Sequence, residues 1–318
     1  MNLSFATILG AAAPVFVLLG MGYGLRRIRV LTEEADASLL KLVIRVFYPC
    51  LFLDYIIGNP ALKEGSNLVA APGIGFITTS GGFLVAFLIA RSIGLKRGKG
   101  LRTFSFCNGI YNYGFIPIPV ILALFDDRAT LGVLLVHNVG VEVAIWSIGI
   151  TLLAGHFEVK ALKKIISPPL VALIVALSIN FAGLDNSVPE WIANPVSLLG
   201  ACTIPIGIML AGASVADLFS SQGIFEMPKI GLGSIGVRLG LLPFLFVLLA
   251  AFLPNITTEL RQVIVIQAAM PAGIMPIVLS RHYGGDASVA VRVVIATTLA
   301  SVVTMPLWIQ FGLRFVLN

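Results

Sequence analysis

The sequence predicts an all-α membrane protein with ten transmembrane helices, arranged as two inverted repeats of five. Three observations support this: an apolar composition, an uneven distribution of Lys and Arg between successive connections, and two interrupted apolar segments half the chain apart. Hydrophobic residues make up 58% of the 318 residues and charged residues 11%, and the mean hydropathy is +1.01. Soluble domains carry about 25% charged residues, so this composition is typical of a lipid-embedded protein.

The ten predicted helices follow one another along the whole chain. A hydrocarbon core requires about 20 apolar residues per helix. Windows of this kind cover residues 5–25, 36–57, 68–93, 101–124, 130–154, 168–184, 196–218, 228–252, 259–281 and 287–313. The connections are too short for a soluble domain, so we expect one membrane unit with a first repeat at 1–160 and a second at 161–318.

Basic residues are concentrated in alternate connections of the first half. The first, third and fifth connections hold eleven of them: Arg26, Arg27, Arg29, Arg91, Lys96, Arg97, Lys99, Arg102, Lys160, Lys163 and Lys164. The second, fourth and sixth hold only Lys63 and Arg128. By the positive-inside rule the odd connections are cytoplasmic, so both termini are expected outside a multi-pass protein of the cell (inner) membrane. Each helix is then inverted relative to its counterpart in the other half.

Two of the apolar segments are interrupted by Gly and Pro, at residues 108–119 and 267–276. Such residues free backbone groups that hydrocarbon cannot satisfy, so lipid-embedded helices avoid them. Equivalent residues lie 159 positions apart, half the chain length: Asn108 and Gln267, Gly114 and Gly273, Pro117 and Pro276. Matched breaks in two halves indicate the midplane substrate site of a secondary transporter.

The motifs around these breaks resemble those of the auxin efflux carrier family. Residues 112–119, Asn-Tyr-Gly-Phe-Ile-Pro-Ile-Pro, are similar to the N-x-G-[FN]-x-G-x-P motif in that family's broken fourth helix, although Pro117 stands where Gly is usual. Other similar stretches, in chain order, are 47–52, 204–214, 270–272, 283–286, 297–301 and 304–308. The long cytoplasmic loop of the plant exporters is absent, as in bacterial members.

This resemblance implies both a fold and a class of substrate. The family fold is an inverted repeat of ten helices with the broken fourth and ninth helices crossing, and the bile acid/sodium symporter superfamily shares it. The family moves organic anions: auxin in plants, and dicarboxylates such as malate or malonate in bacteria. We therefore expect a secondary active transporter of a small carboxylate or dicarboxylate, working by alternating access. A sodium-coupled symporter of the bile-acid type is the alternative.

The candidate substrate-binding residues lie at the two breaks. Half-helix N-termini present free N–H groups to an anion, and unwound carbonyls can bind a cation. The candidates are Asn108, Asn112, Gly114, Pro117, Pro119, Gln267, Met270, Pro271, Gly273, Pro276 and, from the eighth helix, Arg238. The amides could instead cap the interrupted backbone, the prolines shape the site rather than touch ligand, and Arg238 could extend to an interface.

A second group of polar residues could couple transport to an ion. Charged residues inside spans are functional hypotheses by default. The candidates are Glu142, His137, Asn138, Asp54, Thr297 and Thr298. Asn138 and Glu142 share a helix face through their spacing of four residues. Glu142 could instead form an ion pair with Arg238, Asp54 could be a solvated helix end, and the threonines could be ordinary packing residues.

The sequence does not favour the competing classes of protein. The basic pI of about 9.4 is not accompanied by a basic stripe with interleaved aromatics, so no nucleic-acid partner is expected. No motif of a membrane protease, esterase, zinc hydrolase or ATPase is complete, so we expect no enzyme and no cofactor. A channel stays open as a less favoured class. No metal site is firm, coupling to Na⁺ or H⁺ stays open, and beyond substrate and bilayer the one partner left open is a second copy in a homodimer.

Overall fold

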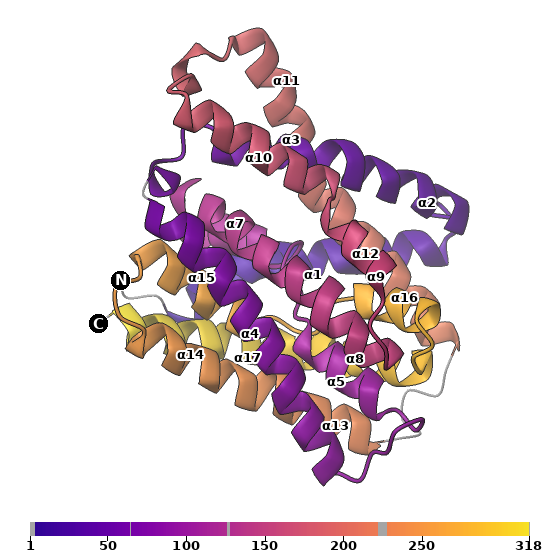
Figure 1. Ribbon diagram of the computed structural model, residues 1–318. Coiled ribbons are helices and arrows are strands. Elements are labelled where there is room, and N and C mark those ends of the chain that lie inside the picture. The colour runs from indigo at the N-terminus through magenta and orange to yellow at the C-terminus, as the bar shows by residue number, and fades with distance from the viewer. Residues whose placement is uncertain (1–3, 64, 126–127, 222–227, 318) are drawn as a thin grey trace.

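The computed structural model describes residues 4–63, 65–125, 128–221 and 228–317, which fold as helices without a named strand in these ranges (Figure 1). The helices of the first half are α1 (Phe5–Arg27), α2 (Glu33–Leu42), α3 (Tyr48–Ile56), α4 (Gly65–Ser92), α5 (Leu101–Gly109), α6 (Pro117–Phe125), α7 (Arg128–Ala144), α8 (Ile150–Ala154) and α9 (Val159–Leu162). Those of the second half are α10 (Pro168–Phe181), α11 (Glu190–Ala201), α12 (Thr203–Ser221), α13 (Pro228–Gly236), α14 (Leu242–Phe252), α15 (Thr258–Ala269), α16 (Met275–His282) and α17 (Ala287–Leu317). An all-α fold is therefore confirmed.

Every predicted span coincides with helical structure, but some spans consist of several pieces. Six helical stretches are long and apolar enough to cross a membrane within the described residues, and the bent pair Val159–Ile165 and Pro168–Phe181 would make a seventh. The predicted spans 36–57, 101–124 and 259–281 are built from shorter helices. The count of ten is not confirmed by this criterion and stays a prediction.

Polar side chains define several helix starts. The hydroxyl of Ser4 accepts a hydrogen bond from the Thr7 N–H at the start of α1, and Thr32, Ser167 and Thr257 serve α2, α10 and α15 in the same way. Each cap satisfies one N–H group that has no partner within its helix.

Two helices widen into a π-helical turn just before a proline. The π turn Val43–Phe47 precedes Pro49, and the π turn Val237–Leu241 precedes Pro243. Proline has no N–H to donate and crowds the preceding turn, so a widened turn accommodates it without ending the helix. The second π turn contains Arg238.

The helices pack as two groups. In one, α1 lies along α12, while α10 and α11 pack on α3; in the other, α4 lies against α5 and α7, and α15 contacts α7, α14 and α17. In Figure 1 the group with α10, α11 and α3 forms the upper part of the molecule and the group with α4, α14 and α17 the lower part.

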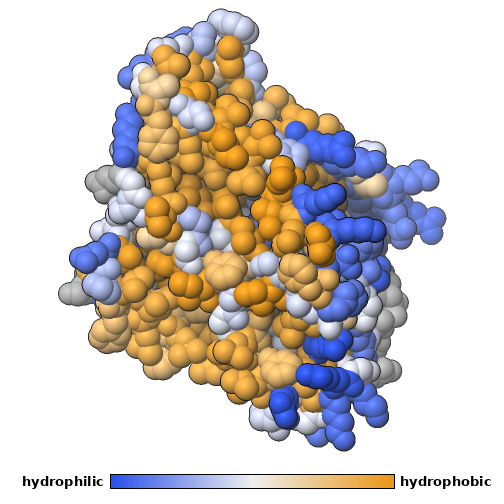
Figure 2. Space-filling model, viewed as in Figure 1, coloured by the Kyte–Doolittle hydropathy of each residue, from blue (hydrophilic) through white to orange (hydrophobic). Residues whose placement is uncertain are grey.

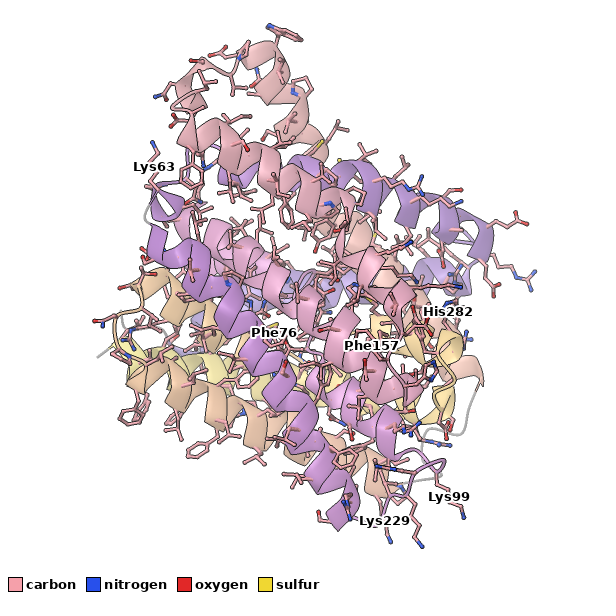
Figure 3. All side chains as sticks on the ribbon, in the orientation of Figure 1. Lys63, Phe76, Lys99, Phe157, Lys229 and His282 are labelled. Atoms are coloured by element: carbon pink, nitrogen blue, oxygen red, sulfur yellow. The ribbon has the colours of Figure 1, made fainter. Side chains whose placement is uncertain are left out.

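The surface carries a broad apolar area bordered by polar groups. In Figure 2 hydrophobic side chains cover most of the visible face, and hydrophilic ones gather along its right-hand and lower right-hand edge. Exposed large apolar residues include Val69, Trp191, Leu198 and Leu232, each at least 70% exposed. Both termini lie at one end (Figure 1), whereas Lys99, Lys229 and His282 lie at the opposite end (Figure 3). Such a surface suits an integral membrane protein.

Candidate functional site

The two breaks meet and pair with each other. The first break, residues 110–116, lies between α5 and α6, and the second, residues 270–274, lies between α15 and α16. The Asn112 N–H donates to the Pro271 carbonyl at 2.8 Å, and the Gly273 N–H donates to the Ile110 carbonyl at 3.0 Å, which forms an antiparallel bridge between the breaks. Each break therefore supplies backbone partners that the other lost. The predicted crossing of the two broken helices is confirmed.

Arg238 caps the carbonyl groups that the second break leaves free. Its side chain is fully buried; Nε donates to the Met270 carbonyl at 3.0 Å, and Nη2 donates to the carbonyls of Ala268 at 2.9 Å and Gln267 at 3.3 Å. The guanidinium also lies over the ring of Tyr111, 5.1 Å from its centroid. A cation is favourable at the C-terminal end of a helix because the helix dipole is negative there.

No carboxylate among the described residues forms an ion pair with the guanidinium of Arg238. The ion pairs between described residues do not include one between Arg238 and Glu142, so this alternative is not what the structure contains. The Nη1 atom of Arg238 is buried and has no hydrogen-bond partner among the described residues. A buried cation with a spare donor is a group that can attract an anion.

Thr297 fixes the second break to α17. Its hydroxyl accepts a hydrogen bond from the Ala272 N–H at 3.2 Å and donates to the Val293 carbonyl at 2.8 Å. Thr298 is partly exposed and lies outside these bonds. Through these two hydrogen bonds Thr297 holds the backbone of the second break against α17.

The first break gathers the polar residues of α7 and α15. The carbonyl of Tyr113 accepts hydrogen bonds from Asn138 Nδ2 at 2.8 Å and from Gln267 Nε2 at 3.2 Å. Gln267 Nε2 also donates to Asn138 Oδ1 at 3.0 Å, and Gln267 Oε1 is buried with no partner among the described residues. Asn138, predicted for ion coupling, and Gln267, predicted for substrate binding, thus form one cluster. Among the described residues this cluster leaves Gln267 Oε1 as an acceptor without a partner.

Glu142 lies beside the same break. Its carboxylate accepts hydrogen bonds from the Tyr113 hydroxyl at 2.5 Å and from Trp146 Nε1 at 2.7 Å. The Tyr113 hydroxyl is also 3.9 Å from the sulfur of Met275 at the start of α16. The shared helix face of Asn138 and Glu142 places both side chains on Tyr113, as their spacing predicts.

Two residues of this cluster, Tyr113 and Trp146, were not among the sequence-predicted site residues. Tyr113 lies inside the quoted motif of the first break, and Trp146 follows Glu142 by four residues. A search for hydrogen-bond donors one helical turn from Glu142 would have found Trp146. The hydroxyl of Tyr113 could not have been assigned because its partner is 29 residues away.

Asn108 and Asn112 take different positions from Gln267. Asn108 is fully buried and donates to the Phe104 carbonyl at 2.8 Å and to Ser234 Oγ at 3.3 Å, while its Oδ1 has no partner in the described part of the chain. Asn112 is partly exposed, and its Oδ1 accepts from the Ile116 N–H at 3.3 Å, just before α6. The side chain of Asn112 therefore caps the interrupted backbone, as the alternative interpretation of the amides predicts.

The Gly and Pro residues shape the crossing. A Cβ atom on Gly114 would lie 2.3 Å from the hydroxyl of Tyr48, so a larger residue would have to displace that side chain where α3 approaches the first break. A Cβ on Gly273 would be 3.3 Å from the Tyr111 carbonyl. Pro117 is the first residue of α6 and Pro276 the second of α16, where a missing N–H costs no helical bond, and Pro119 follows in the first turn of α6.

His137 and Asp54 contact other groups. His137 is buried, with Nδ1 3.5 Å from Asn138 Oδ1 and its ring 6.5 Å from that of Tyr111. Asp54 forms an ion pair with Arg128 at 3.3 Å and accepts from Ser197 Oγ at 3.2 Å. These contacts of Asp54 join α3, α7 and α11, and within the described part of the chain they lie outside both breaks.

An all-helical membrane protein with two interrupted helices that pair where they cross is the class that fold and site define. Comparison with known families identifies the chain further. The family described as "Membrane transport protein" matches residues 7–159 and again residues 156–309, so the chain belongs to this family, the one that its motifs resemble.

Two curated relatives cover nearly the whole chain. An uncharacterized transporter of Methanothermobacter thermautotrophicus is 26% identical over 302 residues, which are 92% of this chain and 95% of the relative. An uncharacterized transporter of Methanocaldococcus jannaschii is 23% identical over 303 residues, with the same coverage. The protein is therefore a member of a membrane transport family.

Proposed function

We propose that this protein is a secondary active transporter that moves a small organic anion, a carboxylate or dicarboxylate, by alternating access. The observation that carries the proposal is the mutual pairing of the two breaks through Asn112 and Gly273. Interrupted helices persist in a membrane protein only where the protein satisfies their backbone, and this arrangement is typical of a transporter's binding site.

The charges at the crossing favour an anion over a cation. Arg238 brings a buried positive charge whose Nη1 is free to donate, and the half-helices α6 and α16 begin at the breaks. The N-termini of helices attract negative charge. We propose that the substrate carboxylate binds near these groups, with the amides of Gln267, Asn138 and Asn112 completing the contacts.

Glu142 is the proposed coupling residue. Its carboxylate is bonded to Tyr113 within the first break and could bind and release a proton as that break changes shape. Coupling to Na⁺ is the alternative, because the free amide oxygen of Gln267 is a hard ligand of the kind that sodium accepts. We propose the cell membrane as the site of action, with both termini outside.

Reconstitution into proteoliposomes tests the function. A panel of labelled mono- and dicarboxylates is offered under a proton gradient, a sodium gradient or neither, and uptake and counterflow are measured. Saturable uptake with counterflow of at least one carboxylate is expected. Flux that neither saturates nor shows counterflow would indicate a channel, and the absence of any anion flux would refute the proposal.

A pair of asparagine variants tests whether the flux depends on the residues at the breaks. Asn138→Ala removes an amide that bonds to Tyr113, while Asn67→Ala removes a buried amide near the start of α4, whose partners Thr257 and Ala61 lie outside both breaks. Transport should fall in Asn138→Ala and stay near wild type in Asn67→Ala. Equal losses in both, normalised to folded protein, would argue against a site at the breaks.

A further inference from the structure

One lysine of the connection between the two halves lies over the ring of Trp146, a hydrogen-bond donor to Glu142. Lys164 lies in the 3-10 turn Lys163–Ile165, after α9 and before α10. Its Nζ is 5.1 Å from the centroid of the Trp146 ring and 5.6 Å from that of the Tyr283 ring. Both distances fall within the range of a cation–π interaction.

The contact of Lys164 with Trp146 continues to the carboxylate of Glu142. Trp146 follows Glu142 by one helical turn, and its indole N–H donates to the Glu142 carboxylate. The indole is only 8% exposed, and Lys164 lies over its ring together with Tyr283 from the end of α16. The lysine therefore covers the ring whose N–H is bonded to Glu142.

The same connection borders an opening in the surface. Residues 166–168, which directly follow the turn, line a depression of about 490 Å³ together with Arg45 and Pro49. Tyr48, the neighbour of Pro49, has its hydroxyl against Gly114 of the first break. His282, the neighbour of Tyr283 in the chain, lies with Lys99 and Lys229 at the end of the molecule away from Lys63 (Figure 3). The charge pattern assigns this end to the cytoplasm.

We propose that Lys164 is a gate residue that closes the cytoplasmic approach to the Glu142 carboxylate while it lies over Trp146 and Tyr283. Its departure from the two rings exposes the indole and opens the approach. The inference rests on the proposed function, because it assigns the gate to a transport cycle in which the site faces the cytoplasm in turn. An exposed cation–π contact is weak enough to be broken in each cycle.

The exposure of Trp146 tests the gate without measuring transport. The three tryptophans are labelled with 5-fluorotryptophan in the full chain in lipid nanodiscs, and the Trp146 resonance is assigned by its loss in Trp146→Phe. Broadening by a neutral water-soluble paramagnet then reports exposure. In Lys164→Gln the broadening should rise about two- to fivefold, the change expected from losing one exposed cation–π contact.

Three variants separate the gate from a general loosening of the protein. Lys164→Arg keeps a cation over the rings and should behave as wild type. Lys163→Gln changes the same charge one residue away, at an exposed lysine without a ring contact among the described residues, and should have no effect. Tyr283→Leu removes one ring and should raise the broadening in the same direction as Lys164→Gln. Equal broadening in Lys164→Gln and wild type, or in Lys163→Gln and Lys164→Gln, would overturn the gate.

Sided transport gives the second readout. In oriented proteoliposomes Lys164→Gln should alter the KM measured from the cytoplasmic side and leave that from the external side unchanged; equal changes on both sides would overturn the gate. If the wild type moves no anion while the Trp146 signal still responds to Lys164, the transport function fails rather than the contact. If the wild type transports and the signal does not respond, the gate alone fails.

Discussion

The first break (110–116) and the second (270–274) lose the same kind of backbone groups but satisfy them differently. In the second break the carbonyls are held by the buried guanidinium of Arg238 and an N–H by the hydroxyl of Thr297. In the first break the carbonyl of Tyr113 is held by two amide side chains, and its ring reaches an ionisable carboxylate. Asn112, Tyr113 and Phe115 are also partly exposed, whereas Met270, Pro271 and Ala272 are buried.

This difference indicates a division of labour between the breaks. A permanently charged arginine on three carbonyls fixes the second break, because removing it would leave buried polar groups without partners. Amide and carboxylate contacts at the first break can be exchanged for a ligand or altered by a proton at smaller cost. We infer that the second break is the fixed element and the first the adjustable one.

The largest effect is expected when the fixed element loses its cation. Arg238→Gln should lower the free energy of unfolding by about 3 kcal/mol, because several buried carbonyls lose a charged donor. Denaturation in mixed detergent measures this loss. Arg261→Gln is the matched control: Arg261 caps the end of α14 through the carbonyls of Ala250, Ala251 and Leu253, but is only partly buried. Equal losses in the two variants would mean that the second break has no special need of its arginine.

The adjustable break should carry the coupling. Glu142→Gln keeps an acceptor for the Tyr113 hydroxyl but cannot ionise, so accumulation driven by a proton gradient should fall by about tenfold or more while anion exchange at equal pH persists. Both are measured in proteoliposomes. Glu158→Gln, which removes the carboxylate that pairs with His156 near the end of α8, should leave both unchanged. Undiminished proton-driven accumulation in Glu142→Gln would exclude this carboxylate as the proton carrier.

Gln267 joins the two elements and should contribute to affinity. Gln267→Ala should raise the KM for the substrate about tenfold, the effect of losing roughly one hydrogen bond to a charged group. Gln262→Ala is a close match, because Gln262 is on the same helix and contacts α7 through Thr130 at 2.8 Å. A KM that changes equally in both variants would assign Gln267 to helix packing alone.

The smallest effect separates the two tyrosines of the first break. Tyr113→Phe removes the hydroxyl that donates to Glu142 and should change the KM or the pH dependence of transport by about threefold, the lower end of the effect of one hydrogen bond. Tyr111→Phe removes a hydroxyl held by Thr78 at 3.3 Å and Thr79 at 3.4 Å, and should affect stability slightly and transport not at all. A stronger transport defect in Tyr111→Phe would reverse the assignment of the adjustable contacts.

The positions of the helices and of both breaks could be predicted from the sequence. Apolar runs, Gly and Pro act through neighbouring residues, so the interruptions between Gly109 and Pro117 and between Ala269 and Met275 are visible in the local pattern. The 159-residue repeat between Asn108 and Gln267 then pairs the two breaks. The spacing of Asn138 and Glu142 likewise gave their common helix face.

Only the tertiary structure decided what each break contacts. The partners of Arg238 lie about 30 residues away and those of Gln267 lie 129 and 154 residues away, so no local pattern could show that the arginine proposed to attract the anion also caps α15. The repeat also hid a difference, because Asn108 turns to Ser234 while its counterpart Gln267 turns to Tyr113. A break in a helix is set by the residues that cannot continue it, whereas the groups that satisfy it come from whichever segments the fold brings alongside.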